Sequence, residues 1–233
     1  MQVAALSAQL RKFTSVGAIL ALAPFAAQAQ VVGAYDGGNC YPFSCLASDS
    51  GGSTYQQVYL ASAFSGTTTF NTIRFFQDSP GLMDSATYDI SFSTTSASVG
   101  ALDSTWANNI GGDSAFFGTF TLGGSMPSVL TLTGNAFNYD PTLGNLLMHV
   151  GISNLTEAHG YESYFQADYA GVEVSRMWAY GGSSTGSTGT GALRTEFTTV
   201  AAPVPEPETY AMMLAGLGLL GVMARRRKQK LNA

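Results

Sequence analysis

Apolar and polar residues alternate along most of the chain between residues 30 and 200, and this alternation limits the fold more than any other feature. Within residues 86–93, polar neighbours separate the apolar residues Tyr88, Ile90 and Phe92. Successive side chains of a β-strand point to opposite faces, so the pattern is typical of strands with one buried face. We expect nine such strands, over residues 57–64, 68–76, 86–93, 115–122, 130–133, 146–152, 163–169, 172–178 and 193–197.

Short segments rich in glycine, proline and aspartate separate the expected strands, as is typical of turns. Many short strands joined by turns predict an all-β fold, and we expect a β-sandwich of jelly-roll type over residues 30–200. One short helix is expected near residues 103–109, followed by Gly111. Residues 181–191 contain only Gly, Ser and Thr, which predicts a long flexible hairpin loop. The expected turns are Ser79-Pro80-Gly81, Gly111-Gly112-Asp113, Gly123-Gly124, Gly134-Asn135 and Asp140-Pro141.

The N-terminal 29 residues have the three parts of a secretory signal peptide. Arg11 and Lys12 precede an apolar stretch over residues 13–25, and Ala27-Gln28-Ala29 supplies small residues for cleavage. We therefore expect residues 1–29 to be removed and the mature chain to begin at Gln30. An uncleaved N-terminal anchor is the alternative, which the shortness of the apolar stretch disfavours.

The C-terminus carries three elements in series: Pro205-Glu206-Pro207, an apolar run over residues 210–224, and a cluster of cations. As a helix, the apolar run would be about 22 Å long, whereas a membrane span usually needs about 20 residues. We expect a Pro-rich linker over residues 201–209, a short transmembrane helix over 210–224 and a basic cytoplasmic tail over 225–233. Basic residues stay on the cytoplasmic side, so the preceding domain should face outwards. These basic residues include Arg225, Arg226, Arg227 and Lys228.

This tail resembles the PEP-CTERM sorting signal of Gram-negative bacteria in the order, spacing and terminal position of its three parts. The resemblance implies that an integral membrane enzyme, exosortase, recognises the tail and processes it near Pro205-Glu206-Pro207. It also implies a transient stage in the inner membrane, followed by transfer to the cell surface or the exterior. The strands around residues 87–95, 117–120 and 137–141 resemble uncharacterised ectodomains of other PEP-CTERM proteins, which have no assigned activity.

The charges of the chain are unevenly distributed. Residues 30–204 contain thirteen Asp and Glu but only three Arg, a net charge of −10, whereas the whole chain carries −5. An exported domain this acidic should repel nucleic acids, so we expect no nucleic-acid partner. The charge is compatible with a neutral polysaccharide.

Cys40 and Cys45 are the two cysteines of the chain. Export places them in an oxidising compartment, where a disulfide is expected. Pro42 favours a turn that would bring the two thiols together. A metal site is the alternative, but it would need two further ligands, and neither histidine lies nearby in the sequence.

The sequence contains none of the common local motifs of catalytic or metal-binding sites. We therefore expect no enzymatic activity, no cofactor and no metal, although a triad assembled in space leaves no local signal. His149 lies in an alternating strand and should be a satisfied strand residue. His159, with Glu157 and Glu162, should lie in a solvated loop, a weak metal site being the alternative. A calcium site at the loop aspartates, Asp78, Asp84 and Asp140, is a further alternative.

Four aromatic residues near the end of the domain suggest a ligand: Tyr161, Tyr164, Trp178 and Tyr180. Aromatic side chains that stay exposed can stack on sugars, although aromatics in strands more often fill a core. The leading function is therefore a structural or interaction role in an exopolysaccharide matrix, and a carbohydrate-binding module is the alternative. An exposed coplanar pair among the four would favour the alternative, and burial of all four would remove its motive.

Overall fold

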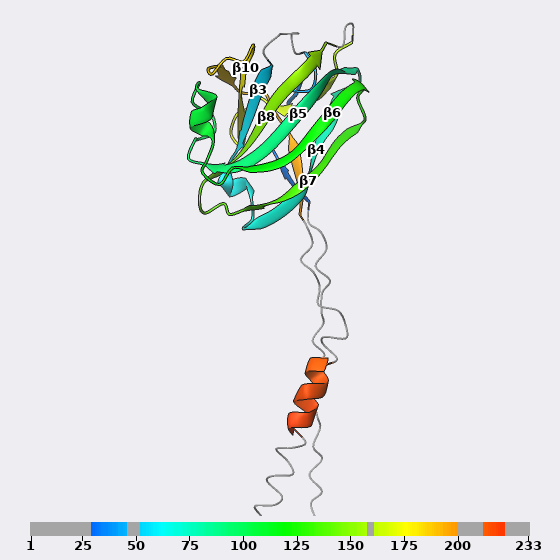
Figure 1. Ribbon diagram of the computed structural model, residues 1–233, viewed down its shortest axis with the longest axis vertical. Helices are drawn as coiled ribbons and strands as arrows, with labels where there is room; N and C mark the ends of the chain where they lie inside the picture. The colour runs from blue at the N-terminus through cyan, green and yellow to red at the C-terminus, as the bar shows by residue number, and fades with distance from the viewer. Residues whose placement is uncertain (1–28, 46–51, 158–160, 200–211, 222–233) are drawn as a thin grey trace, which may run out of the picture. The chain divides into compact units, whose positions relative to one another are not determined.

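The computed structural model describes residues 29–45, 52–157, 161–199 and 212–221 (Figure 1). One compact unit spans Ala26–Pro203. Its elements, in chain order, are β1 Ala29–Val32, β2 Gly37–Asn39, β3 Ser53–Tyr59, the 3-10 turn η1 Ala61–Ala63, β4 Thr68–Ser79, β5 Leu82–Thr95, the 3-10 turn η2 Trp106–Asn109, β6 Ala115–Ser125, β7 Val129–Tyr139, β8 Asn145–Thr156, β9 Tyr164–Asp168, β10 Val174–Ala179, β11 Ser187–Gly189, β12 Ala192–Leu193 and β13 Thr195–Thr199.

The strands form two antiparallel sheets. The first has the order β1-β13-β4-β9-β12, with β2 paired to β9 and β7 paired to β4. The second has the order β11-β10-β3-β8-β5-β6, and Figure 1 shows its larger strands side by side. Two antiparallel sheets around one core confirm the expected all-β sandwich class, while the jelly-roll topology stays a prediction.

Alternation along the strands places the aromatic side chains between the sheets. On β5, Tyr88, Ile90 and Phe92 are buried, while Asp89 between them is exposed. The buried faces of both sheets contribute to one hydrophobic cluster, whose members lie between Val32 and Phe197. Among the described residues, all members of this core cluster therefore lie within the one compact unit.

A second, smaller cluster covers the outer face of the second sheet. Leu102 packs there against Val58, Leu147 and Met177. His149 lies on the same face, where its ring stacks on Trp106 at 5.3 Å between centroids.

The Nδ1 atom of His149 is 3.2 Å from the side-chain nitrogen of Gln56. Burial lowers the pKa of the His149 imidazole, which favours its neutral form. The structure therefore agrees with the interpretation of His149 as a satisfied strand residue.

Several predicted boundaries were wrong. The helix expected over residues 103–109 is only the 3-10 turn η2. Asp103 caps no α-helix; its carboxylate accepts hydrogen bonds from the Thr105 backbone amide and the Asn108 side chain. The strand expected over 57–64 begins four residues earlier and ends before η1. The loop expected over 181–191 contains the short strand β11. The single strand expected over 193–197 is two strands in the structure. Of these, β12 pairs with β9, whereas β13 pairs with β1 and β4.

Two expected turns lie inside strands instead. Gly123-Gly124 belongs to β6 and Gly134-Asn135 to β7. A Cβ atom at Gly134 would overlap the carbonyl oxygen of Phe117, because β6 and β7 approach closely at this point. Glycine is therefore needed at position 134 for packing between strands rather than for a turn.

Both ends of the domain lie at one end of the sandwich. Ala29 on β1 pairs with Thr198 on β13, and the Gln30 side chain donates a hydrogen bond to the carbonyl of Ala63, just beyond the end of β3. We call the opposite end, where β3 begins at Ser53 and β4 ends at Ser79, the far end.

The other described segment is a helix over residues 212–221, within the expected span 210–224. No helix in the described part of the chain is long and apolar enough to cross a membrane. The signal peptide predicted over residues 1–29 lies outside the described residues except for Ala29, which begins β1, and the predicted linker over 201–209 and basic tail over 225–233 lie outside them too.

We predict that Gly134→Ala destabilises the domain by about 1–3 kcal/mol, because the added methyl group overpacks the contact between β6 and β7. Gly112→Ala is the matched control, since a Cβ atom there meets no atom within 4 Å. Both changes reduce the entropy of the unfolded chain similarly. Urea unfolding of the two variants measures the difference, and equal stabilities would show that β6 and β7 do not meet at Gly134.

Candidate functional site

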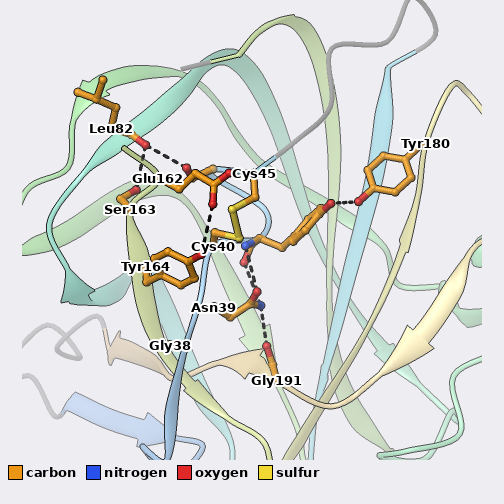
Figure 2. The surroundings of a disulfide bond; sticks show 12 residues. Gly38, Asn39, Cys40, Cys45, Leu82, Glu162, Ser163, Tyr164, Tyr180 and Gly191 are labelled. Carbon is orange, nitrogen blue, oxygen red and sulfur yellow. Dashed lines mark hydrogen bonds between the residues drawn. A yellow bond between two sulfur atoms is a disulfide. The ribbon is translucent and has the colours of Figure 1, made fainter. Parts of the chain in front are cut away.

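The disulfide between Cys40 and Cys45 organises the far end of the sandwich (Figure 2). The two Cα atoms are 5.6 Å apart, which confirms the predicted pairing. Asn39 fixes the start of the loop, because its side-chain amide donates to the carbonyl of Gly191 at 2.6 Å and its oxygen accepts from the Tyr41 amide at 3.2 Å.

The disulfide loop has a buried side and a surface side. Phe43 is fully buried, and its ring centroid lies 5.2–5.3 Å from those of Phe75, Tyr88 and Phe165. Tyr41, two residues before Phe43, is half-buried at the surface. Phe43 therefore anchors the loop in the core, and this anchor holds Tyr41 in place at the surface.

Tyr41 joins three other residues in a cluster of rings around one cation. Its ring centroid lies 6.2 Å from Trp178 and 6.1 Å from Tyr180. The Tyr41 and Tyr180 hydroxyl groups share a hydrogen bond (Figure 2). The Arg176 guanidinium lies 4.6 Å from the Trp178 ring centroid and 5.7 Å from that of Tyr41. We call these four residues the Trp178 cluster.

Among the described residues, Arg176 forms no ion pair, and a backbone carbonyl group holds its side chain. Its Nε atom donates to the carbonyl of Thr190 at 2.9 Å. Its Nη1 atom is buried and has no hydrogen-bond partner among the described residues. Burial raises the pKa of Tyr41, Arg176 opposes this shift, and the charges of Asp84 and Glu162 add to it. Positive and negative charges thus both act on the same surface.

Tyr161 and Tyr164 lie on the other side of the disulfide. Figure 2 shows Glu162 and Tyr164 on one side of the sulfur atoms and Tyr180 on the other. The Tyr164 hydroxyl donates to Glu162 at 3.2 Å, and this bond raises the pKa of Tyr164. Tyr161 is 80% exposed. It borders an open cavity of about 450 Å³, which is also lined by Pro80, Gly81, Leu82, Ser125 and Met126.

The structure thus brings the four predicted aromatic residues to one end of the domain, but in two groups. None of the four is buried. Trp178 and Tyr180 both contact Tyr41, with tilted interplanar angles of 36° and 59°. The ring contacts of the described residues include no pair formed by two of the four, so the coplanar pair that would favour a sugar site is not among them.

Sequence reasoning missed Tyr41 and Arg176 as members of the site. Two signals could have found them. Tyr41 directly follows Cys40, so a closed disulfide restrains it. Arg176 stands two residues before Trp178 on β10 and therefore points to the same face of the sheet.

One group of metal-ligating side chains converges among the described residues: Cys40, Cys45 and Glu162, whose ligand atoms lie within 4.8 Å of one another. Both sulfur atoms belong to the disulfide and have no thiolate to offer a metal. The loop aspartates considered for calcium are not brought together by the described structure. His159 lies outside the described residues.

We predict that Phe43→Ala destabilises the domain more than removal of the disulfide. Loss of a buried phenyl ring costs about 3–5 kcal/mol, whereas a loop as short as this disulfide's should contribute less than about 3 kcal/mol. Urea unfolding of Phe43→Ala and of the double variant Cys40→Ser with Cys45→Ser compares the two. A larger loss of unfolding free energy in the double cysteine variant than in Phe43→Ala would contradict the anchoring role of Phe43.

The sorting motif Pro205, Glu206 and Pro207 and the basic residues after residue 224 lie outside the described residues. Residues 203–228 match the family model of the PEP-CTERM protein-sorting motif. No curated protein and no solved structure shows significant similarity to the chain. The chain therefore carries a PEP-CTERM sorting signal after a β-rich domain, and this signal implies an exported protein that exosortase sorts at the membrane.

Proposed function

We propose that this PEP-CTERM protein is a non-enzymatic structural or interaction protein of the cell envelope or extracellular matrix, associated with exopolysaccharide. It passes through the inner membrane of a Gram-negative bacterium and is then released to the cell surface or the exterior. The match of residues 203–228 to the sorting motif is the observation that carries this proposal.

The arrangement of the domain's ends supports release by processing near Pro205-Glu206-Pro207. The last strand, β13, ends at Thr199, and Pro205 stands six residues later in the chain. A cut at or near the motif would therefore leave β13 and its pairing with β1 intact. The released domain would keep both sheets and its whole hydrophobic core.

The composition of the domain also fits an exported location. Its two cysteines form a disulfide, as expected in an oxidising compartment. Its net charge of −10 over residues 30–204 disfavours nucleic acids and other polyanions as partners.

We predict that replacing Pro205, Glu206 and Pro207 by alanine leaves the chain unprocessed in the membrane fraction. The reason is that the motif supplies the joint that the processing enzyme recognises, while the apolar run still holds the chain. Fractionation and immunoblotting in a host that contains exosortase measure this. The matched control replaces the flanking Val204 and Thr209 by alanine and should be processed normally. Identical fractionation of the triple variant and the natural sequence would contradict the proposal.

A carbohydrate-binding module is the second candidate function. It is favoured by the exposure of Tyr161 and Tyr180, by the partial exposure of Tyr164 and Trp178, and by the position of all four at the far end. A glycan array probed with residues 30–203 should then show saturable binding. Absence of binding would leave the structural role in the matrix as the only candidate.

A further inference from the structure

We infer that the Trp178 cluster binds a neutral saccharide, with Trp178 and Tyr180 as contact residues and Arg176 as a positioning residue. This inference rests on the carbohydrate-binding candidate above and adds the ligand's charge class and the roles of individual residues.

The rings of the cluster are held in place before any ligand binds. Trp178 lies on β10, which pairs with β3 on one side and β11 on the other. Tyr41 lies in the disulfide loop that Phe43 anchors in the core. Tyr180 remains 36% exposed and shares a hydrogen bond with Tyr41. Rigid aromatic rings provide contact area with little loss of conformational entropy.

Arg176 supports the indole ring. Its guanidinium is 4.6 Å from the Trp178 centroid and is fixed by the bond from Nε to Thr190. A planar guanidinium stacks on an aromatic ring, whereas the ammonium group of lysine cannot do so in the same way. Arg176 therefore sets the position of the Trp178 ring, and its contribution to binding should depend on this planarity.

The charges around the cluster select against charged ligands. The domain has a net charge of −10, and Asp84 and Glu162 both act on Tyr41, so an acidic sugar is repelled. The Arg176 guanidinium already lies over the Trp178 and Tyr41 rings, where a cationic ligand would bind, so a ligand meets the exposed Tyr180 ring and the part of Trp178 that Arg176 leaves uncovered. A neutral sugar avoids both penalties, and its hydroxyl groups can form hydrogen bonds with the Tyr41 and Tyr180 hydroxyl groups.

The site lies away from the ends of the β-domain. Ala29 and Thr199 lie at one end of the sandwich, and the Trp178 cluster lies with the disulfide at the far end.

Affinity gel electrophoresis of residues 30–203, which contain the whole core, tests the inference. Dextran, mannan and a β-glucan serve as neutral probes, and alginate and polygalacturonate as acidic ones. We expect at least one neutral probe to retard the domain, with less than about a twofold change between 20 and 500 mM salt, because no ion pair is formed. Trp178→Ala should weaken this binding by at least about tenfold, because it removes the largest ring of the contact surface.

Phe116→Ala is the matched control, because Phe116 is an exposed aromatic residue on β6 that lies outside the cluster. It should bind like the natural sequence. Arg176→Lys keeps the charge but not the planar group, so it should bind several-fold more weakly while its urea unfolding midpoint stays within error. Normal binding by Arg176→Lys would remove the positioning role.

Three results would overturn the inference: no retardation by any neutral probe, retardation by acidic probes alone that decreases with salt, or equal weakening by Trp178→Ala and Phe116→Ala. The assay uses residues 30–203, which end before the sorting motif. A failure here therefore leaves tail processing unaffected, and a failure of tail processing leaves these binding results unaffected.

Discussion

The packing of Phe197 in the core is the interaction on which the rest of the structure depends. This residue lies on the last strand, β13, and its ring lies 4.9–5.4 Å from those of Tyr59 in the second sheet, Phe70 in the first sheet and Phe64 just after η1. The strand also pairs with β1 and β4, so it joins the start of the domain to its centre. The domain can therefore be complete only when β13 is in place, and processing has to occur beyond it.

The fold class could be predicted from the sequence because the two-residue period of a strand is a property of the backbone. Tyr88, Ile90 and Phe92 show this period without help from other segments. Close approaches between distant segments leave no such local signal. Gly134 was interpreted as a turn residue, although it is needed where β7 passes close to β6. The sorting motif was recognisable because its three parts follow one another in the chain, whereas Tyr41 and Arg176 meet Trp178 only after folding.

The three arginines of the domain are all engaged within it. Arg74 forms an ion pair with Glu196 at 2.8 Å, Arg194 donates to Gln166 and lies over Phe76, and Arg176 lies over Trp178. The thirteen acidic residues of residues 30–204 thus dominate the charge of the domain, while seven of the ten basic residues of the chain stand in the two terminal segments. Removal of both segments would turn a weakly acidic chain into a strongly acidic domain. Such a domain repels a polyanion but not a neutral polysaccharide.

If the terminal segments direct the chain to the exterior and an intact β-domain remains there, the mass of the secreted protein will show it. The protein is recovered from the cell surface or medium of a host that contains exosortase, and its intact mass is measured. We expect a chain that begins at Gln30 and ends at or beside Pro205-Glu206-Pro207, with the Cys40–Cys45 disulfide closed. A mass that includes residues 210–233, or an end within β13, would contradict it.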